Sequence, residues 1–112
     1  MTTLFEKIIA REVPSDVLYE DDAIIAIRDI APQAPIHLLI IPKEPIAKVQ
    51  DVKELDLIGK MVRVAQNLAK ELHIESGYRL VINNGAEAGQ TVFHLHMHLL
   101  GGAPLGDRMT EC

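Results

Sequence analysis

The sequence predicts an α+β domain in which a five-stranded antiparallel sheet carries one long and one short helix. Five short runs are rich in β-branched and apolar residues, and one long segment between the third and fourth runs has apolar residues at helical spacing. No repeat, linker or low-complexity stretch interrupts the 112 residues. A single domain of ordinary size is therefore expected to span residues 1–112.

A short helix is expected near the start of the chain, over residues 4–11. The segment Thr3-Leu-Phe-Glu6 is a capping box, in which a threonine and a glutamate three residues later satisfy each other's backbone amides. Pro14 ends the helical pattern. The face expected to be buried consists of Leu4, Phe5 and Ile8.

Three β-rich runs come next. Val17–Glu20 and residues 23–29 are separated by Asp21-Asp22, a pattern typical of a hairpin. The prolines of residues 30–35 exclude a helix in the loop that follows. Residues 36–41 are predicted to form the third strand, which Pro42 stops.

The apolar period then changes from two residues to three and four. Residues 51–73 are predicted to form one amphipathic helix. Its buried face is expected to consist of Leu55, Ile58, Val62, Ala65, Ala69 and Leu72. Residues 78–83 and 93–100 are predicted as the fourth and fifth strands, joined by a glycine-containing loop.

Composition limits the possible partners and location. The formal charge is −5 and no run of lysine or arginine occurs, which disfavours binding to a polynucleotide. No apolar stretch is long enough for a signal peptide or a membrane span, so a cytoplasmic location is expected. The single Cys112 allows no intrachain disulfide and is expected to be a solvated tail residue.

The predicted fifth strand carries the side chains best suited to a functional site, three histidines. Side chains alternate across a strand, so His94, His96 and His98 are expected on one face, opposite the core residues Leu95, Met97 and Leu99. Three adjacent imidazoles are a poor choice for stability alone, because each needs hydrogen-bond partners when buried.

Three interpretations of the histidines remain open at this point: a wet polar groove, a zinc site and nucleophilic catalysis with acid–base assistance. Zinc requires a further carboxylate or thiolate ligand, or an open catalytic position, and the flanking residues are instead Gln90, Thr91 and Gly101. The sequence therefore favours catalysis and predicts no metal.

The segment His94-Leu-His-Met-His-Leu-Leu100 resembles the His-φ-His-φ-His-φ-φ signature of the histidine triad (HIT) superfamily, where φ is apolar. Residues 28–37, 78–83 and 89–93 and the trailing Leu100-Gly-Gly102 are similar to the Hint branch, and the similarity spans residues 4–105. The third histidine distinguishes the chain from the nucleotidylyltransferase branch, and Gly101-Gly102 distinguishes it from the dinucleotide polyphosphate hydrolases.

The resemblance implies a HIT-like fold and a purine nucleoside 5′-phosphoramidase, which releases a nucleoside monophosphate and an amine without a cofactor. It implies that His96 is the nucleophile of a covalent nucleotidyl-histidine, that His98 donates to a phosphate oxygen and that His94 orders the triad. His37 matches a supporting position beside them. The implied partners are a purine nucleotide and a second copy of the chain, paired through the long helix and residues 78–83.

The resemblance also implies a nucleotide-binding set. Asp29 and Ile30 match the ribose site. The loop on the phosphate side is matched by Asn83, Gly89, Gln90 and Thr91. The purine slot is matched by Leu4, Phe5, Ile8, Val13 and Ile27. From the residues alone, Asp29 is equally suited to capping a turn before Ala31-Pro32, and the slot residues to the core.

Two departures from the Hint pattern and two other functions accompany this interpretation. Ile27 stands where many relatives have phenylalanine, and Thr91 replaces the commoner serine but keeps a hydroxyl. The alternative functions are a purine-nucleotide-binding or scaffolding protein with incidental hydrolysis, and a hydrolase of dinucleoside polyphosphates or acyl adenylates. The tail, residues 106–112, matches no pattern.

Overall fold

The computed structural model describes residues 2–107 and has the α+β architecture expected from the sequence. The elements of this part of the chain are, in order, α1 (Leu4–Ile9), β1 (Val17–Glu20), β2 (Ile24–Arg28), β3 (Ile36–Pro42), the 3₁₀-helix η1 (Val49–Asp51), α2 (Asp56–Glu71), β4 (Tyr78–Val81), the 3₁₀-helix η2 (Ala86–Ala88) and β5 (Met97–Gly101).

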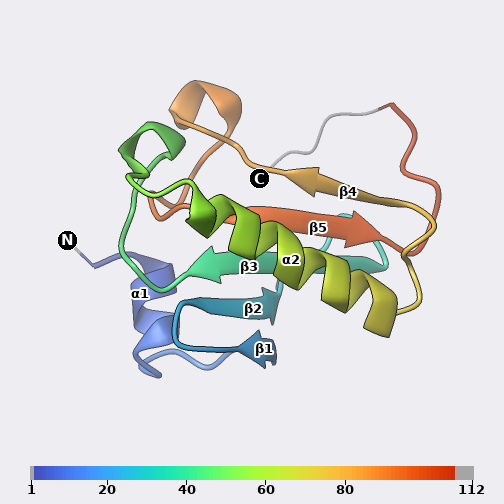
Figure 1. Ribbon diagram of the computed structural model, residues 1–112, viewed down its shortest axis with the longest axis horizontal. Helices are drawn as coiled ribbons and strands as arrows, with labels where there is room; N and C mark the ends of the chain where they lie inside the picture. The colour runs from blue at the N-terminus through green and yellow to red at the C-terminus, as the bar shows by residue number, and fades with distance from the viewer. Residues whose placement is uncertain (1, 108–112) are drawn as a thin grey trace.

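The strands form one antiparallel sheet in the order β1-β2-β3-β5-β4 (Figure 1). β3 and β5 lie at its centre, while β1 and β4 form the two edges. α2 crosses one face of the sheet, and α1 lies at one end of the molecule, beside β2 and β3 (Figure 1). The long helix is inserted between the third and fourth strands, as the sequence predicts.

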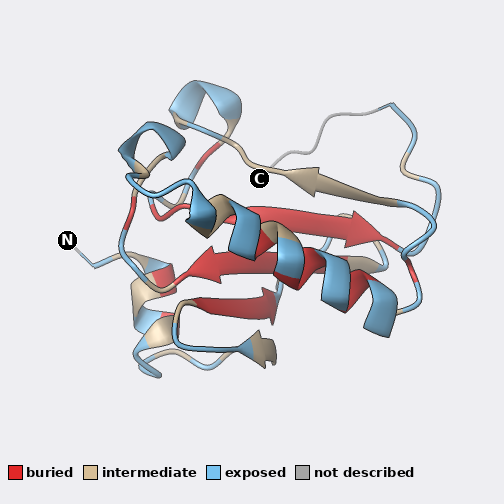
Figure 2. Ribbon diagram, viewed as in Figure 1, coloured by how far each residue is buried: buried red, intermediate tan, exposed pale blue. Residues whose placement is uncertain are grey.

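Each face of the sheet has its own apolar cluster, because side chains alternate along the strands. The cluster under α2 combines Leu38 and Ile40 of β3 with Met97 and Leu99 of β5 and with the inner face of the helix. The cluster on the opposite face is built around α1 and consists of Phe5, Ile8, Ile25, Ile27, Leu39 and Ile41. In Figure 2, β2, β3 and β5 are buried, whereas the edge strands β1 and β4 are less so. The outward face of α2 is exposed.

The capping box of α1 is present: the Thr3 hydroxyl accepts from the Glu6 amide, and the Glu6 carboxylate accepts from the Thr3 amide. The helix nevertheless ends at Ile9 rather than Arg11, which has a positive φ of 64°. Leu4 was expected in the core with Phe5 and Ile8, but its side chain is 45% exposed.

The predicted helix over residues 51–73 is too long at both ends. Residues 49–51 form η1, and Val52 then has an extended ψ of 121°, so α2 begins only at Asp56. Leu55, expected on the buried face, is 72% exposed because it precedes the helix. The buried residues of α2 are Met61, Val64, Ala65, Leu68 and Ala69, a stripe rotated slightly from the one expected.

The largest correction concerns the histidine strand. β5 begins at Met97, so His98 is the only histidine of the three within the strand. The ladder between β3 and β5 ends at the pair Ile40–Met97, and the Leu95 amide donates instead to the Ile46 carbonyl at 2.6 Å. Residues 94–96 therefore approach the site as irregular backbone, although Leu95, Met97 and Leu99 all lie in the core as expected.

Within residues 2–107, no helix is both long and apolar enough to cross a membrane. Cys112, expected to be solvated, lies outside the described residues, as do the other residues after Asp107.

Candidate active site

A pocket of about 290 Å³ opens on the sheet face opposite α2. One wall is apolar and comes from α1 and β2, and two imidazoles lie on the other side. Of the residues singled out in the sequence, those that line it are Leu4, Phe5, Ile8, Val13, Ile27, Asp29, Ile30, Thr91, His96 and His98. The fold therefore brings together positions that are far apart in the chain.

His96 is held in one tautomer by its own backbone neighbourhood. Its Nδ1 lies 2.7 Å from the carbonyl oxygen of His94, which only accepts, so Nδ1 carries the hydrogen. In the neutral ring the lone pair is then on Nε2. The edge-on contact with Phe5, at 4.9 Å between ring centres, fixes the plane of the imidazole.

His98 has the opposite tautomer, set by a relay that starts at a backbone amide. The Gln33 amide donates to Nδ1 of His37 at 3.0 Å, so neutral His37 carries its hydrogen on Nε2. That nitrogen lies 2.9 Å from Nδ1 of His98 and donates to it. Neutral His98 therefore carries its own hydrogen on Nε2 and is a donor there.

The two adjacent imidazoles thus offer complementary groups. Their ring centres are 5.1 Å apart, and both rings line the pocket. Burial lowers the pKa of His96, and burial together with the neighbouring imidazoles of His96 and His37 lowers the pKa of His98 to about 3. At neutral pH the site therefore presents a lone pair on one ring and an N–H on the next, which suits attack on phosphorus with support of its oxygens.

His94 does not line the pocket and acts through its backbone. Its Nε2 donates to the Pro42 carbonyl at 2.6 Å, anchoring the turn whose carbonyl holds His96. Among residues 2–107, its Nδ1 is a buried nitrogen without a hydrogen-bond partner. The ordering role expected of His94 thus has a geometric basis, although the side chain is not beside His98.

Asp29 both caps a turn and faces the pocket. Its Oδ1 accepts from the Ala31 amide at 2.9 Å, the turn-capping contact weighed from the sequence. Its Oδ2 lies 3.4 Å from Nε2 of His37, and the half-buried side chain still lines the pocket. Ile30, beside it, is 95% exposed, so it offers an apolar surface that a ligand in the pocket can cover.

The sequence placed Asn83, Gly89, Gln90 and Thr91 on the phosphate side, in the loop before β5. Only Thr91 of its four expected residues lines the pocket. The side chain of Gln90 is buried and bonds the Gly85 amide and the carbonyls of Ala47 and Val92, which holds the loop itself. The Gly89 amide donates to the Ala86 carbonyl within η2, and Asn83 lies away from the pocket wall.

Several lining residues escaped the sequence argument. They are Pro14, Ser15, Arg28, Ala31, Gln33, Leu39 and Val92. Leu39 had a usable signal, since alternation along the strand puts it on the same face as His37. Gln33 had none, because its contribution to His37 comes from the backbone amide, which every residue except proline possesses.

The atoms of Asp29, His37 and His98 lie within 4.8 Å of one another, as in a metal site. The two imidazole nitrogens, however, point at each other, with 2.9 Å between them and 5.1 Å between ring centres. A tetrahedral zinc ion about 2.0–2.1 Å from each nitrogen would hold them roughly 3.3 Å apart, with both lone pairs aimed at the metal. This geometry fits a shared hydrogen better than a metal ion.

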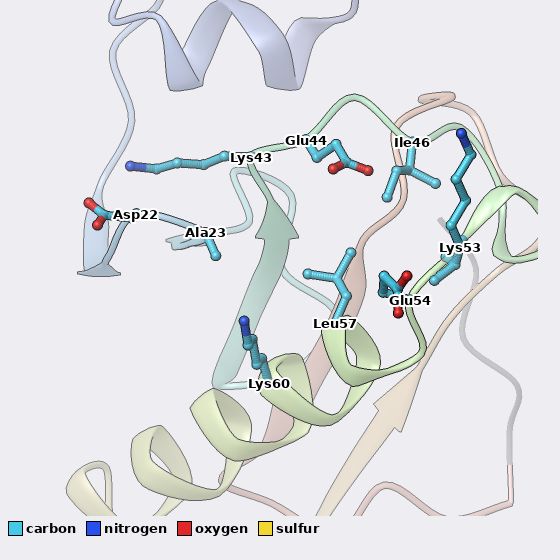
Figure 3. Close-up of a pocket in the computed structure, with 10 residues that line it drawn as sticks. Asp22, Ala23, Lys43, Glu44, Ile46, Lys53, Glu54, Leu57 and Lys60 are labelled. Atoms are coloured by element: carbon cyan, nitrogen blue, oxygen red, sulfur yellow. The ribbon is translucent and has the colours of Figure 1, made fainter.

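A second hollow, of about 450 Å³, lies on the α2 side of the sheet. Figure 3 shows Lys43, Lys53 and Lys60 around it, interspersed with carboxylates, and Leu57 of α2 at its floor. Lys43 is already paired with Glu20 at 2.7 Å. No imidazole, hydroxyl or thiol of residues 2–107 lines this hollow, so it lacks the paired histidines that distinguish the first pocket.

Acid is expected to destabilise the fold through these imidazoles. Because the folded-state pKa of His98 is about 3 against an ordinary 6.5, the unfolded chain binds more protons between these values. The contribution of His98 to the free energy of unfolding is therefore fully present above about pH 6.5. It is lost as the pH is lowered from there toward 3. Urea unfolding at pH 7, 5.5 and 4.5 measures the decline, which should be smaller in His98→Asn; an equal decline in both proteins would contradict this assignment.

Known proteins share both the sequence and the architecture. The HIT domain family matches residues 10–105. The purine nucleoside phosphoramidase of Escherichia coli K12 is 52% identical over 112 residues, covering 97% of this chain and 94% of that protein. A HIT family hydrolase from Clostridium thermocellum has a TM-score of 0.92 at 50% identity, with 97% of each chain covered. Another HIT family hydrolase, from Legionella pneumophila, has a TM-score of 0.89 at 47% identity, covering 93% of this chain and 96% of that one.

Proposed function

This chain belongs to the HIT domain family, and from that membership we propose that it is a hydrolase of purine nucleoside 5′-phosphoramidates. The products are a nucleoside monophosphate, such as AMP, and an amine. The observation that carries the proposal is the pair of opposite tautomers at one pocket, a lone pair on Nε2 of His96 beside an N–H on Nε2 of His98. The name of the Escherichia coli relative supports the same bond and substrate class.

The pocket suits a nucleotide whose base lies on the apolar wall. Phe5, Ile8 and Ile27 form that wall and bind the purine, with the exposed Ile30 at its rim. Asp29, which lines the same pocket, accepts from the ribose hydroxyls. The 5′-phosphorus then lies next to His96 and His98, in the pocket that Thr91 also lines.

The reaction proceeds in two displacements. Nε2 of His96 attacks phosphorus, a new P–N bond forms to the ring, and the bond to the substrate amine breaks. The amine leaves with a proton supplied from the side of Thr91 or His98, and the nucleotidyl group remains on His96. Water then attacks the same phosphorus and the P–N bond to His96 breaks. One proton of the water returns to the group that protonated the amine, so the nucleoside monophosphate leaves and both groups are neutral again.

Phosphoramidates are expected to be cleaved faster than phosphate esters of AMP. Attack by His96 exchanges one P–N bond for another, and an amine is protonated readily before it departs, whereas a bridging ester oxygen is much less basic. Steady-state kcat/KM is compared for adenosine 5′-phosphoramidate and an alkyl ester of AMP. Faster ester cleavage, or tight AMP binding with no turnover of either compound, would contradict the proposal; the second result would indicate a nucleotide-binding protein.

We also propose that the chain forms a homodimer. β4 is an edge strand whose four residues are all half-buried, and an edge strand can pair with the same strand of a second copy. α2 lies over the same side of the molecule (Figure 1) and would extend such an interface. Sedimentation equilibrium at micromolar concentration should give about twice the chain mass of 12.4 kDa; a mass of one chain would contradict the dimer.

A further inference from the structure

Asp29 and His98 compete for one hydrogen, and we propose that this competition couples the ligand's sugar to the catalytic imidazoles. A ligand hydroxyl that binds Asp29 releases the Nε2–H of His37 to His98, so Asp29 is a positioning residue for phosphate chemistry as well as a binding residue. This inference rests on the proposed function and adds to it: the sugar contributes to turnover and not only to binding.

The hydrogen in question is a single one. The Gln33 amide occupies Nδ1 of His37, so the ring has one N–H, on Nε2. Two acceptors lie near that nitrogen: Nδ1 of His98 at 2.9 Å and Oδ2 of Asp29 at 3.4 Å. The imidazole is closer, but the carboxylate is charged, and hydrogen bonds to ionised acceptors are roughly twice as strong as neutral ones. The structure has the shorter bond, to His98, and the charged carboxylate is close enough to compete for the same hydrogen.

The two acceptors differ in their access to ligand. His37 is buried and does not line the pocket, whereas Asp29 and His98 both do. The other carboxylate oxygen, Oδ1, is already bonded to the Ala31 amide. A ligand hydroxyl therefore meets the oxygen that draws on His37, and once it donates there the N–H of His37 turns fully to His98.

The acceptor that His37 chooses affects the tautomer of His98. When His37 donates to Nδ1 of His98, the hydrogen of His98 must be on Nε2, the form that supports phosphate oxygens. When Asp29 withdraws the N–H, His37 no longer enforces that tautomer. The sugar hydroxyls therefore raise kcat, while their direct bonds to Asp29 lower KM.

The test compares adenosine 5′-phosphoramidate with its 2′,3′-dideoxy analogue, which has no hydroxyl for Asp29. In the unmodified protein we expect the dideoxy compound to raise KM and also to lower kcat by about five- to tenfold, at the lower end of typical coupling between sites. The variant His37→Gln separates the two effects. A glutamine amide has two hydrogens on one nitrogen and serves both acceptors at once, so the kcat ratio should fall below about twofold while the KM ratio remains.

A readout independent of turnover completes the experiment. The side-chain ¹⁵N shifts of His98 are recorded with AMP and with 2′,3′-dideoxy-AMP, and AMP should give the more complete Nε2–H tautomer. Identical shifts, or a kcat ratio unchanged in a folded His37→Gln protein, would overturn the coupling. If no phosphoramidate is turned over but the shifts still differ, the proposed reaction fails and the coupling stands; if AMP does not bind, both fail.

Discussion

Replacing His96 with alanine is expected to lower kcat toward adenosine 5′-phosphoramidate by about a thousandfold or more. Nε2 of this residue is the nitrogen with a lone pair beside the His98 donor, and its loss removes the only route to the covalent intermediate in the proposed reaction. The affinity for AMP should fall by less than about tenfold, because the apolar wall and Asp29 remain and a single hydrogen bond is worth roughly 0.5–1.5 kcal/mol.

A matched variant keeps the fold and removes only the nucleophile. In His96→Asn, the side-chain amide can still donate to the His94 carbonyl but has no nitrogen at the Nε2 position. Both variants should lack the acid-labile adduct, one AMP per chain, that rapid quenching and mass spectrometry detect on His96 of the unmodified protein. A folded His96→Asn protein with near-normal turnover, or inversion at phosphorus without any adduct, would mean that water attacks directly.

Much of the fold could be predicted because apolar periodicity depends only on residues close together in the sequence. The apolar alternation of Leu95, Met97 and Leu99 placed them in the core, although only two of the three lie in β5. The end of the strand depended on its partner, since β3 pairs β5 only as far as Ile40, and no local pattern reveals this. Leu55 shows the same limit: its spacing fits α2, but the chain turns just before it.

The sequence pointed to side chains that line the pocket, but not to the backbone groups that hold them. His96 and His98 were found by type and spacing, and the apolar wall by the resemblance. The bonds that set their tautomers come from the backbone, from the His94 carbonyl and the Gln33 amide, and backbone groups leave no signal in a sequence. Gln90 illustrates a related point, because its buried amide ties the loop together through backbone groups of Gly85 and Ala47 that the sequence does not single out.

Removing the donor of His98 is expected to lower kcat by about a hundred- to a thousandfold, the usual cost of losing one donor that stabilises developing charge. His98→Asn tests this, since its side-chain oxygen can still accept from His37 while no hydrogen remains at the Nε2 position. The first displacement adds negative charge to the phosphate oxygens beside two buried imidazoles, where an unmet charge is costly. KM should change much less than kcat, because the donor matters most in the transition state.

The reciprocal variant distinguishes the donor from the relay. In His98→Gln the amide nitrogen can occupy the Nε2 position and donate, but the acceptor for His37 is lost. If the donor is what counts, His98→Gln should retain turnover within about tenfold of the unmodified protein and exceed His98→Asn by at least about tenfold. The reverse order, with Asn the more active, would show that His98 serves mainly as the acceptor of His37 and that phosphate charge is met elsewhere in the pocket. Because the Gln variant leaves the N–H of His37 to Asp29 alone, it should also lose the dependence of kcat on the sugar hydroxyls.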